Sequence, residues 1–322
     1  MLPALAGAAA AYVLWRFATD ASPVPPRLVV AALPVYLLLW LATVGLHALR
    51  WRMVVRRLGT EVPLARLAQL WLAARAVGSV VPSGTLGGEP IRAQLLTASG
   101  MPAASAAGAV ALDRSLELAG NMIAGPVCIG TALALGAGSG SGMLAVAVSG
   151  LIGLVLLVAI YVLGARGRPA LVPLFGRPFG FLPQRWRTWM RAHAARADTA
   201  LQAVLAEHPR LVPAGVAVSL AIECLHLFEL AALFAVFALA VPLPLLLLSS
   251  MGIGVAHTVP MPASLGTLEA TQIGLFTVGG EPLATGLAVA VAIRLAETLW
   301  ILVGLACLAT APGWRARERP SC

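Results

Sequence analysis

Long apolar segments restrict the fold of this sequence more than any other feature. Six of them approach or exceed the roughly 20 residues that a helix needs to cross a bilayer, and they span 2–18, 28–49, 103–136, 143–164, 212–240 and 284–310. Only helices and closed barrels satisfy every backbone polar group within hydrocarbon. Segments of this length predict an all-α polytopic membrane protein with about six full transmembrane helices, which form a single membrane domain over 1–322.

The composition excludes the soluble classes. Hydrophobic residues make up 60% of the 322 residues and charged residues 11%, whereas soluble domains hold about 45–50% apolar and about 25% charged residues. A soluble enzyme, a nucleic-acid-binding domain and a disordered chain are therefore excluded. The four cysteines are isolated, without the spacing of a disulfide framework or of metal ligands, so we expect no metal and no cofactor.

The positive charge predicts how the chain is oriented. All 22 basic residues are arginine, the net charge is +9, and the richest segments are 50–57, 166–210 and 315–319. Such loops face the cytoplasm and its anionic lipids. We therefore expect a multi-pass protein of the cytoplasmic (inner) membrane with both termini in the cytoplasm. Residues 165–209 form a cytoplasmic connector. Within it, 184–207 has the pattern of an amphipathic helix on the membrane surface, or alternatively of a solvated connector helix.

Two further apolar stretches, 63–100 and 243–279, are interrupted by Pro and Gly at 81–88 and 259–266. Each arm has only about 13–18 residues, fewer than a comfortable crossing needs. If the three Arg-rich segments share one side, each stretch must return to the side that it left. This predicts two re-entrant hairpins that enter from opposite sides. A full crossing by every arm keeps the same parity and stays open as the alternative.

An internal repeat relates the two halves of the chain. A Glu…Arg…Glu triple recurs with a shift of 180 residues, and small or turn residues near it recur with the same shift. Together with the opposite hairpins, this predicts two inverted repeats, about 28–137 and about 210–310. Transporters that alternate access around a midplane site have this architecture. The matched charged residues are Glu89, Arg114 and Glu117 in the first repeat and Glu269, Arg294 and Glu297 in the second.

The interruptions are candidate substrate-binding loops. Their Gly, Ser and Pro residues permit an irregular backbone, and a helix begins after each of them. A helix N-terminus binds phosphate or carboxylate through its free N–H groups. As an alternative, these are ordinary hairpin turns in which Glu89 and Glu269 are helix N-terminal carboxylates. The candidates are Ser83, Gly84, Gly87, Gly88, Glu89 and Arg92 in the first stretch, and Ser264, Gly266 and Glu269 in the second.

The Arg114/Glu117 and Arg294/Glu297 pairs lie within the long apolar segments. A spacing of three residues places each pair on one helix face. An unpaired charge there costs about 2.5–3.5 kcal/mol on insertion scales, so we expect these faces to point into the protein. Each pair either clamps its helix to the hairpin, or its arginine grips a headgroup phosphate while the glutamate holds the guanidinium.

Acidic residues outnumber basic ones among these candidates. With Asp113 included, the two repeats hold five acids and three bases. An excess of buried carboxylate indicates either proton coupling or a cationic group on the substrate, and both readings stay open. Glu223, His226 and Glu229 share one part of helix 212–240, where they form either a proton relay or a packing cluster.

The motifs in chain order resemble a known family. Trp51-Arg52, the glycine-rich segment that ends in Glu89, Asp113-Arg114…Glu117, the segment 262–269 and Arg294…Glu297 are similar to the membrane domain of lysylphosphatidylglycerol synthase/flippase proteins. The resemblance implies movement of a lipid headgroup across the bilayer, with these loops and Arg/Glu positions near the path. Aminoacyl transfer in that family belongs to a separate soluble domain, which we do not expect here.

The leading hypothesis is a lipid flippase, not an enzyme, whose substrate is a phospholipid or a polyprenyl-phosphate-linked glycan. The sequence has no phosphate-binding loop for a nucleotide, so the driving force is a gradient or the concentration difference of the lipid. Two alternatives remain. One is an integral-membrane transferase with Glu89, Asp113 or His226 as its base, and the other is a non-catalytic partner of a lipid or glycan synthesis complex.

Overall fold

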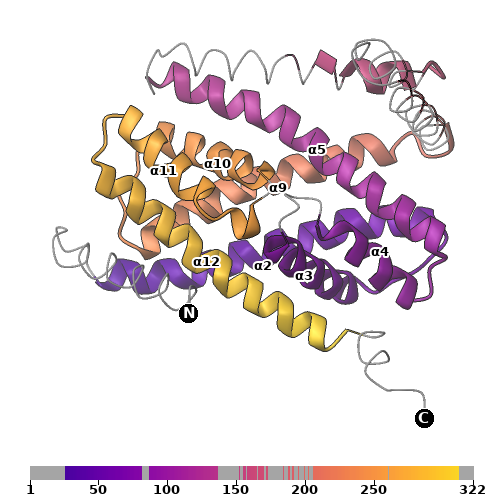
Figure 1. The fold of residues 1–322 in the computed structure, drawn as a ribbon, viewed down its shortest axis with the longest axis horizontal. Coiled ribbons are helices and arrows are strands. Elements are labelled where there is room, and N and C mark those ends of the chain that lie inside the picture. Colours follow the sequence, from indigo (N-terminus) through magenta and orange to yellow (C-terminus); the bar gives the residue numbers. More distant parts are fainter. Residues whose placement is uncertain are drawn as a thin grey trace.

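The computed structural model describes residues 26–81, 87–136, 206–259, 261–311 and part of 152–202, and helices are the only regular structure in these residues. Four long helices alternate with two shorter pairs (Figure 1). In chain order they are α2 (Pro26–Arg57), α3 (Leu64–Val80), α4 (Glu89–Ala98), α5 (Ala103–Ala134), α9 (Leu211–Val236), α10 (Leu243–Thr258), the short 3-10 turn η2 (Pro262–Ser264), α11 (Thr267–Val278) and α12 (Leu283–Ala309).

Four described helices are long and apolar enough to cross a membrane: Ala31–Arg57 within α2, and α5, α9 and α12. Their positions confirm helices at the predicted segments 28–49, 103–136, 212–240 and 284–310. The predicted helix 2–18 lies outside the described residues. Segment 143–164 is helical over 158–164 and lies mostly outside them, as does the predicted amphipathic helix 184–207, in which the individual residues that are described are helical.

The prediction that Arg50-Trp51-Arg52 lies in a loop is wrong. Helix α2 continues to Arg57, and Arg50 and Trp51 are fully buried. An arginine just after an apolar segment has the pattern of a loop residue, but Arg50 meets carboxylates from another helix and therefore remains inside the protein. The basic end of α2 is formed by Arg56 and Arg57 in its last turn.

The two interrupted stretches form pairs of short helices. Helices α3 and α4 have 17 and 10 residues, and α10 and α11 have 16 and 12. At 1.5 Å per residue the longest extends about 26 Å, less than the roughly 30 Å of bilayer hydrocarbon. The arms of the first pair meet backbone to backbone, because a Cβ atom on Gly88 would lie 2.6 Å from the carbonyl oxygen of Ala74. Glycine at this position is what allows α4 to lie so close to α3.

The two halves of the chain interlock. Helix α3 of the first half packs against α12 of the second, α10 of the second packs against α5 of the first, and α2 packs along α9 (Figure 1). One hydrophobic core centres on Trp51, Leu67 and Leu96 of the first half. The other centres on Phe234 and Phe276 of the second half. Both cores also take residues from the other half, such as Leu308 in the first and Tyr36 and Cys128 in the second.

The α3–α12 contact depends on Gly304. A Cβ atom there would collide with the carbonyl oxygen of Leu72 and lie 2.6 Å from the Cβ atom of Ala76. We expect Gly304→Ala to lower the free energy of unfolding by about 1–3 kcal/mol, since overpacking forces the helices apart. Thermal unfolding in detergent measures this effect. Gly130→Ala on α5 is the matched control, because no atom lies within 4 Å of its added Cβ and alanine favours a helix. Equal unfolding midpoints for the two variants would contradict the packing argument.

Candidate functional site

Asp113 is the centre of a buried charge network in the first half. Its side chain on α5 is 0% exposed. Its Oδ1 atom accepts a hydrogen bond from Nε of Arg50 on α2 at 2.9 Å, and its Oδ2 atom accepts one from Nη2 of Arg92 on α4 at 2.5 Å. A buried carboxylate needs such partners because desolvation of its charge is costly. One aspartate therefore ties α2 and α4 to α5.

Two glutamates complete what we call the first charge network. Glu117 accepts from Arg50 at 3.0 Å and from Arg114 at 2.5 Å. Glu89 accepts from Arg92 at 3.3 Å, and its nearest oxygen lies 4.0 Å from Nε of Arg114. With three carboxylates and three guanidinium groups the network is formally neutral. It consists of Arg50, Glu89, Arg92, Asp113, Arg114 and Glu117.

Arg50 is the functional residue that sequence reasoning missed. It extends the first charge network to α9, where its Nη1 atom donates to the hydroxyl of Ser219 at 3.1 Å. The sequence contained an indication of this arginine. Asp113 is an additional carboxylate in the first repeat, because the second repeat has Ile293 at that position, and an additional buried carboxylate needs an additional basic partner. With Arg50 counted, the candidates hold five acids and four bases. The remaining excess of one carboxylate belongs to the second half.

Arg294 on α12 is the centre of the second charge network, which also contains Glu269, Glu297 and His257. Its Nε and Nη2 atoms donate to the two carboxylate oxygens of Glu269 at 2.7 and 3.2 Å, and Nη1 donates to Glu297 at 2.9 Å. The remaining N–H groups reach the carbonyl oxygens of Ala263 and Ser264 at 2.5 and 2.6 Å. All five donors of this guanidinium therefore have acceptors within the protein, which favours the clamp alternative for Arg294.

The second interruption satisfies its own polar groups. Gly266 has φ +81°, a conformation that glycine adopts without strain. Its N–H donates at 2.8 Å to Glu269, the acidic residue in the first turn of α11. His257 at the end of α10 approaches Glu297, with Nε2 at 2.8 Å from the carboxylate. In this loop the helix N-terminus is thus occupied by its own glutamate, which favours the alternative of a hairpin turn.

The two repeats differ at the position of Arg92. Its counterpart, Gln272, is fully buried and accepts a hydrogen bond from the Ser249 hydroxyl at 2.6 Å. Gln272 returns a bond to the Ser249 carbonyl at 3.2 Å. The hairpin of the second repeat is therefore joined arm to arm by neutral groups, whereas Arg92 joins the first hairpin to α5 by an ion pair.

Polar side chains also line the contact between α2 and α9, which we call the α2–α9 seam. Thr43 donates to Glu229 at 3.1 Å, and the rings of His47 and His226 lie 6.0 Å apart between centroids. Nδ1 of His226 is 3.9 Å from the carboxylate of Glu223. Of the candidates for proton coupling, Glu223 pairs with His226, Glu229 accepts from Thr43 of α2, and Asp113 belongs to the first charge network.

Helix α2 contacts α12, and its counterpart α9 contacts α5, but the side chains at these two contacts differ. Trp300 of α12 stacks on Trp40 of α2 at 3.3 Å and donates to the Tyr36 hydroxyl at 2.7 Å. At the corresponding contact, Gly120 of α5 touches Ser219 of α9 so closely that a Cβ atom would lie 2.5 Å from the serine Cβ. Aromatic rings hold α12 away from α2, whereas small residues bring α5 close to α9.

The remaining candidates are Gly87 and Gly88, which lie directly before α4, and Ser83 and Gly84, which lie outside the described residues.

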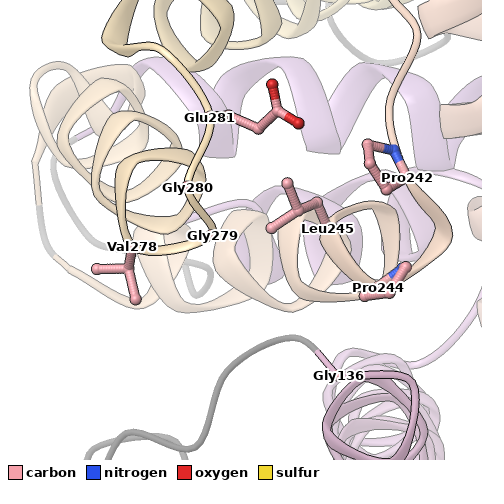
Figure 2. Close-up of a pocket in the computed structure, with 8 residues that line it drawn as sticks. All are labelled: Gly136, Pro242, Pro244, Leu245, Val278, Gly279, Gly280 and Glu281. Carbon is pink, nitrogen blue, oxygen red and sulfur yellow. The ribbon is translucent and has the colours of Figure 1, made fainter.

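A pocket of about 330 Å³ opens at the end of α5, beside the start of α10 and the α11–α12 turn (Figure 2). Among the described residues that line it, Glu281 is the only ionisable one, and none belongs to either charge network. In the described part of the chain, no three His, Cys, Asp or Glu side chains are grouped to hold a metal ion.

Comparison with known proteins identifies the family. A family model described as the lysylphosphatidylglycerol synthase TM region matches residues 4–306, nearly the whole chain. A search of curated proteins finds no match. The match includes both charge networks, the α2–α9 seam and both helix pairs.

Proposed function

Because the chain belongs to the lysylphosphatidylglycerol synthase transmembrane-region family, we propose that it is a lipid flippase. Its substrate is a phospholipid or a polyprenyl-phosphate-linked headgroup, which it moves by alternating access between two inverted repeats. One observation carries the proposal. In each half, an arginine–glutamate network joins the second arm of the hairpin to the last helix, through residues that repeat at a shift of 180.

The repeated clamps support movement of the halves as units. In the first half Arg114 of α5 lies 4.0 Å from Glu89 of α4, and in the second its counterpart Arg294 of α12 lies 2.7 Å from Glu269 of α11. Each hairpin is thereby fixed to its own half while its first arm packs on the other half. The short helices are re-entrant and enter from opposite sides, so their interruptions meet near the bilayer midplane. Inverted-repeat transporters place their binding sites there.

The charged residues have different roles in this proposal. Arg294 and Arg50 use their donors within the protein and are positioning residues. Arg114 is less engaged, because its guanidinium makes one hydrogen bond, to Glu117, whereas that of Arg92 makes two, and its Nε atom, like that of Arg92, is buried without a hydrogen-bond partner among the described residues. It is therefore the member of the two charge networks best able to contact a headgroup phosphate. Two sets of groups are the candidates for proton coupling. One is the second charge network, which has one carboxylate more than it has arginines and also contains His257, and the other is the Glu223–His226 pair.

Leaflet exchange in liposomes tests the function. We expect the purified protein, reconstituted with a headgroup-labelled phosphatidylglycerol, to move the label between leaflets faster than protein-free liposomes do. The lipid should keep its mass. A variant of Arg114, Arg114→Gln, should reduce the rate by about tenfold or more if it loses a charge-assisted bond to phosphate. Arg56→Gln, at the exposed end of α2, should exchange like the wild type.

The other outcomes separate the remaining function classes. A covalently changed lipid would indicate an integral-membrane transferase and contradict a transport role. If the lipid is neither moved nor modified by folded protein across a panel of phospholipids and polyprenyl phosphates, the proposal fails. A non-catalytic partner of a synthesis complex would then be the better interpretation.

A further inference from the structure

Arg75 differs from the arginines of the two charge networks. It is the twelfth residue of the 17-residue helix α3, within the first helix pair, and its side chain is exposed. Every arginine of the two networks has a carboxylate within 4.0 Å, whereas Arg75 has none among the described residues. In the re-entrant hairpin proposed above, a guanidinium inside α3 is costly in the bilayer unless a counter-charge or water reaches it. Arg75 therefore lacks the partner that its position requires.

The protein holds this guanidinium in place by an aromatic contact. The Cζ atom of Arg75 lies 5.5 Å from the ring centroid of Trp71, within the range of a cation–π interaction. Trp71 is itself fixed, because it is buried and stacks on His47 with centroids 4.2 Å apart. The contact orients the guanidinium, whose N–H groups have no acceptor among the described residues.

Arg75 and Trp71 begin a row of side chains that His47 and His226 continue towards α9. Nδ1 of His47 lies 3.4 Å from Nη2 of Arg50. Nε2 of His47 has no hydrogen-bond partner among the described residues. His226, across the α2–α9 seam from His47, has a side chain that is 38% exposed. Glu229 is close enough for the charge of Arg75 to act on it, but its carboxylate accepts from Thr43.

We infer that Arg75, at the α3 end of a row of side chains that continues through Trp71 and His47 to His226, forms a binding site for a phosphate group beside the α2–α9 seam. A phosphate supplies the counter-charge that Arg75 lacks and accepts several N–H bonds at once. The inference rests on the proposed function in assigning a phosphate-bearing lipid to this seam, and it adds a contact separate from both charge networks. The same chemistry fits free phosphate, which the test below distinguishes from a lipid headgroup.

Binding to the detergent-purified full chain tests the site. The probes are inorganic phosphate, a short-chain phosphatidylglycerol and, as an uncharged control, a diacylglycerol of the same chain length. Thermal-shift titration reports affinity, since a ligand of the folded state raises the unfolding midpoint. We expect Arg75→Gln to weaken phosphate binding by about tenfold or more and to leave the midpoint without ligand unchanged. His226→Gln should weaken it to a smaller degree.

Arg56→Gln is the matched control and should bind each probe like the wild type. A response to phosphatidylglycerol alone assigns the site to a lipid headgroup, and a response to inorganic phosphate assigns it to the free ion. The inference is overturned if neither probe binds, if diacylglycerol binds equally well, or if Arg75→Gln binds like the wild type. Phosphate binding that depends on Arg75, in a protein that exchanges no lipid, would refute the proposed function and leave the site intact.

Discussion

Replacing Asp113 with asparagine is expected to cost about 3–5 kcal/mol of unfolding free energy, the usual penalty for breaking a buried ion pair by removing one partner. Among the described residues, Asp113 is the only carboxylate that binds both Arg50 and Arg92, which are themselves buried. An asparagine of nearly the same size leaves two guanidinium groups short of a counter-charge. We expect much less folded protein in the membrane, measured by unfolding in detergent and by the monodisperse fraction after extraction.

An exposed ion pair at the end of α2 provides the control for Asp113. Arg56 and Glu61 lie 3.0 Å apart, with side chains that are 53% and 78% exposed. Glu61→Gln should change the unfolding free energy by less than about 1 kcal/mol, because water screens such a pair. If Asp113→Asn is as stable as Glu61→Gln, the first charge network does not hold α2, α4 and α5 together.

Replacing Arg294 with alanine should lower the unfolding free energy by about 2–4 kcal/mol, because several charge-assisted hydrogen bonds are lost together. Two carboxylates and two loop carbonyls lose their donor. Arg294→Lys should recover only part of the loss, since an ammonium group has three donors and cannot form the same planar fork. The measurement is thermal unfolding in detergent without added lipid.

This prediction separates a clamp from a ligand contact. A clamp is needed in the empty protein, so the loss of stability should appear with no substrate present. Arg56→Ala, which removes only an exposed ion pair, should remain near the wild-type midpoint. If Arg294→Ala unfolds like the wild type but loses lipid exchange, Arg294 contacts the headgroup and the clamp interpretation is wrong.

Much of the helical framework follows from hydropathy. Predicted segments 103–136, 212–240 and 284–310 end within a few residues of α5, α9 and α12, because apolar length and turn residues act locally. The 180-residue repeat also selected Glu89, Arg114 and Glu117, which the structure brings into one network, and Glu269, Arg294 and Glu297, which it brings into another. Charged residues are scarce in this apolar chain and need oppositely charged partners when they are buried. Their positions in the sequence therefore indicated which residues form the networks.

Hydropathy misplaced Arg50 for a physical reason. The cost of burying a charge depends on its partner, and the partner of Arg50 is Asp113, 63 residues away. The row from Arg75 through Trp71 and His47 to His226 was equally hidden, because three separate helices contribute to it. Nothing in the local sequence of α3 distinguishes Arg75, which has no carboxylate partner among the described residues, from Arg66, which bonds to Gln69 on its own helix.

The sequence by itself determined that this chain is helical and embedded in a membrane, where its helices break, and which charged residues recur between its halves. These properties follow from the transfer free energy of each residue and from helix geometry, both of which are local. The tertiary structure decided which charges cancel, that Arg294 is saturated by the protein, and that Arg75 is left without a carboxylate partner in the described residues. Electrostatic pairing acts through space, so it exists only after distant helices have packed together.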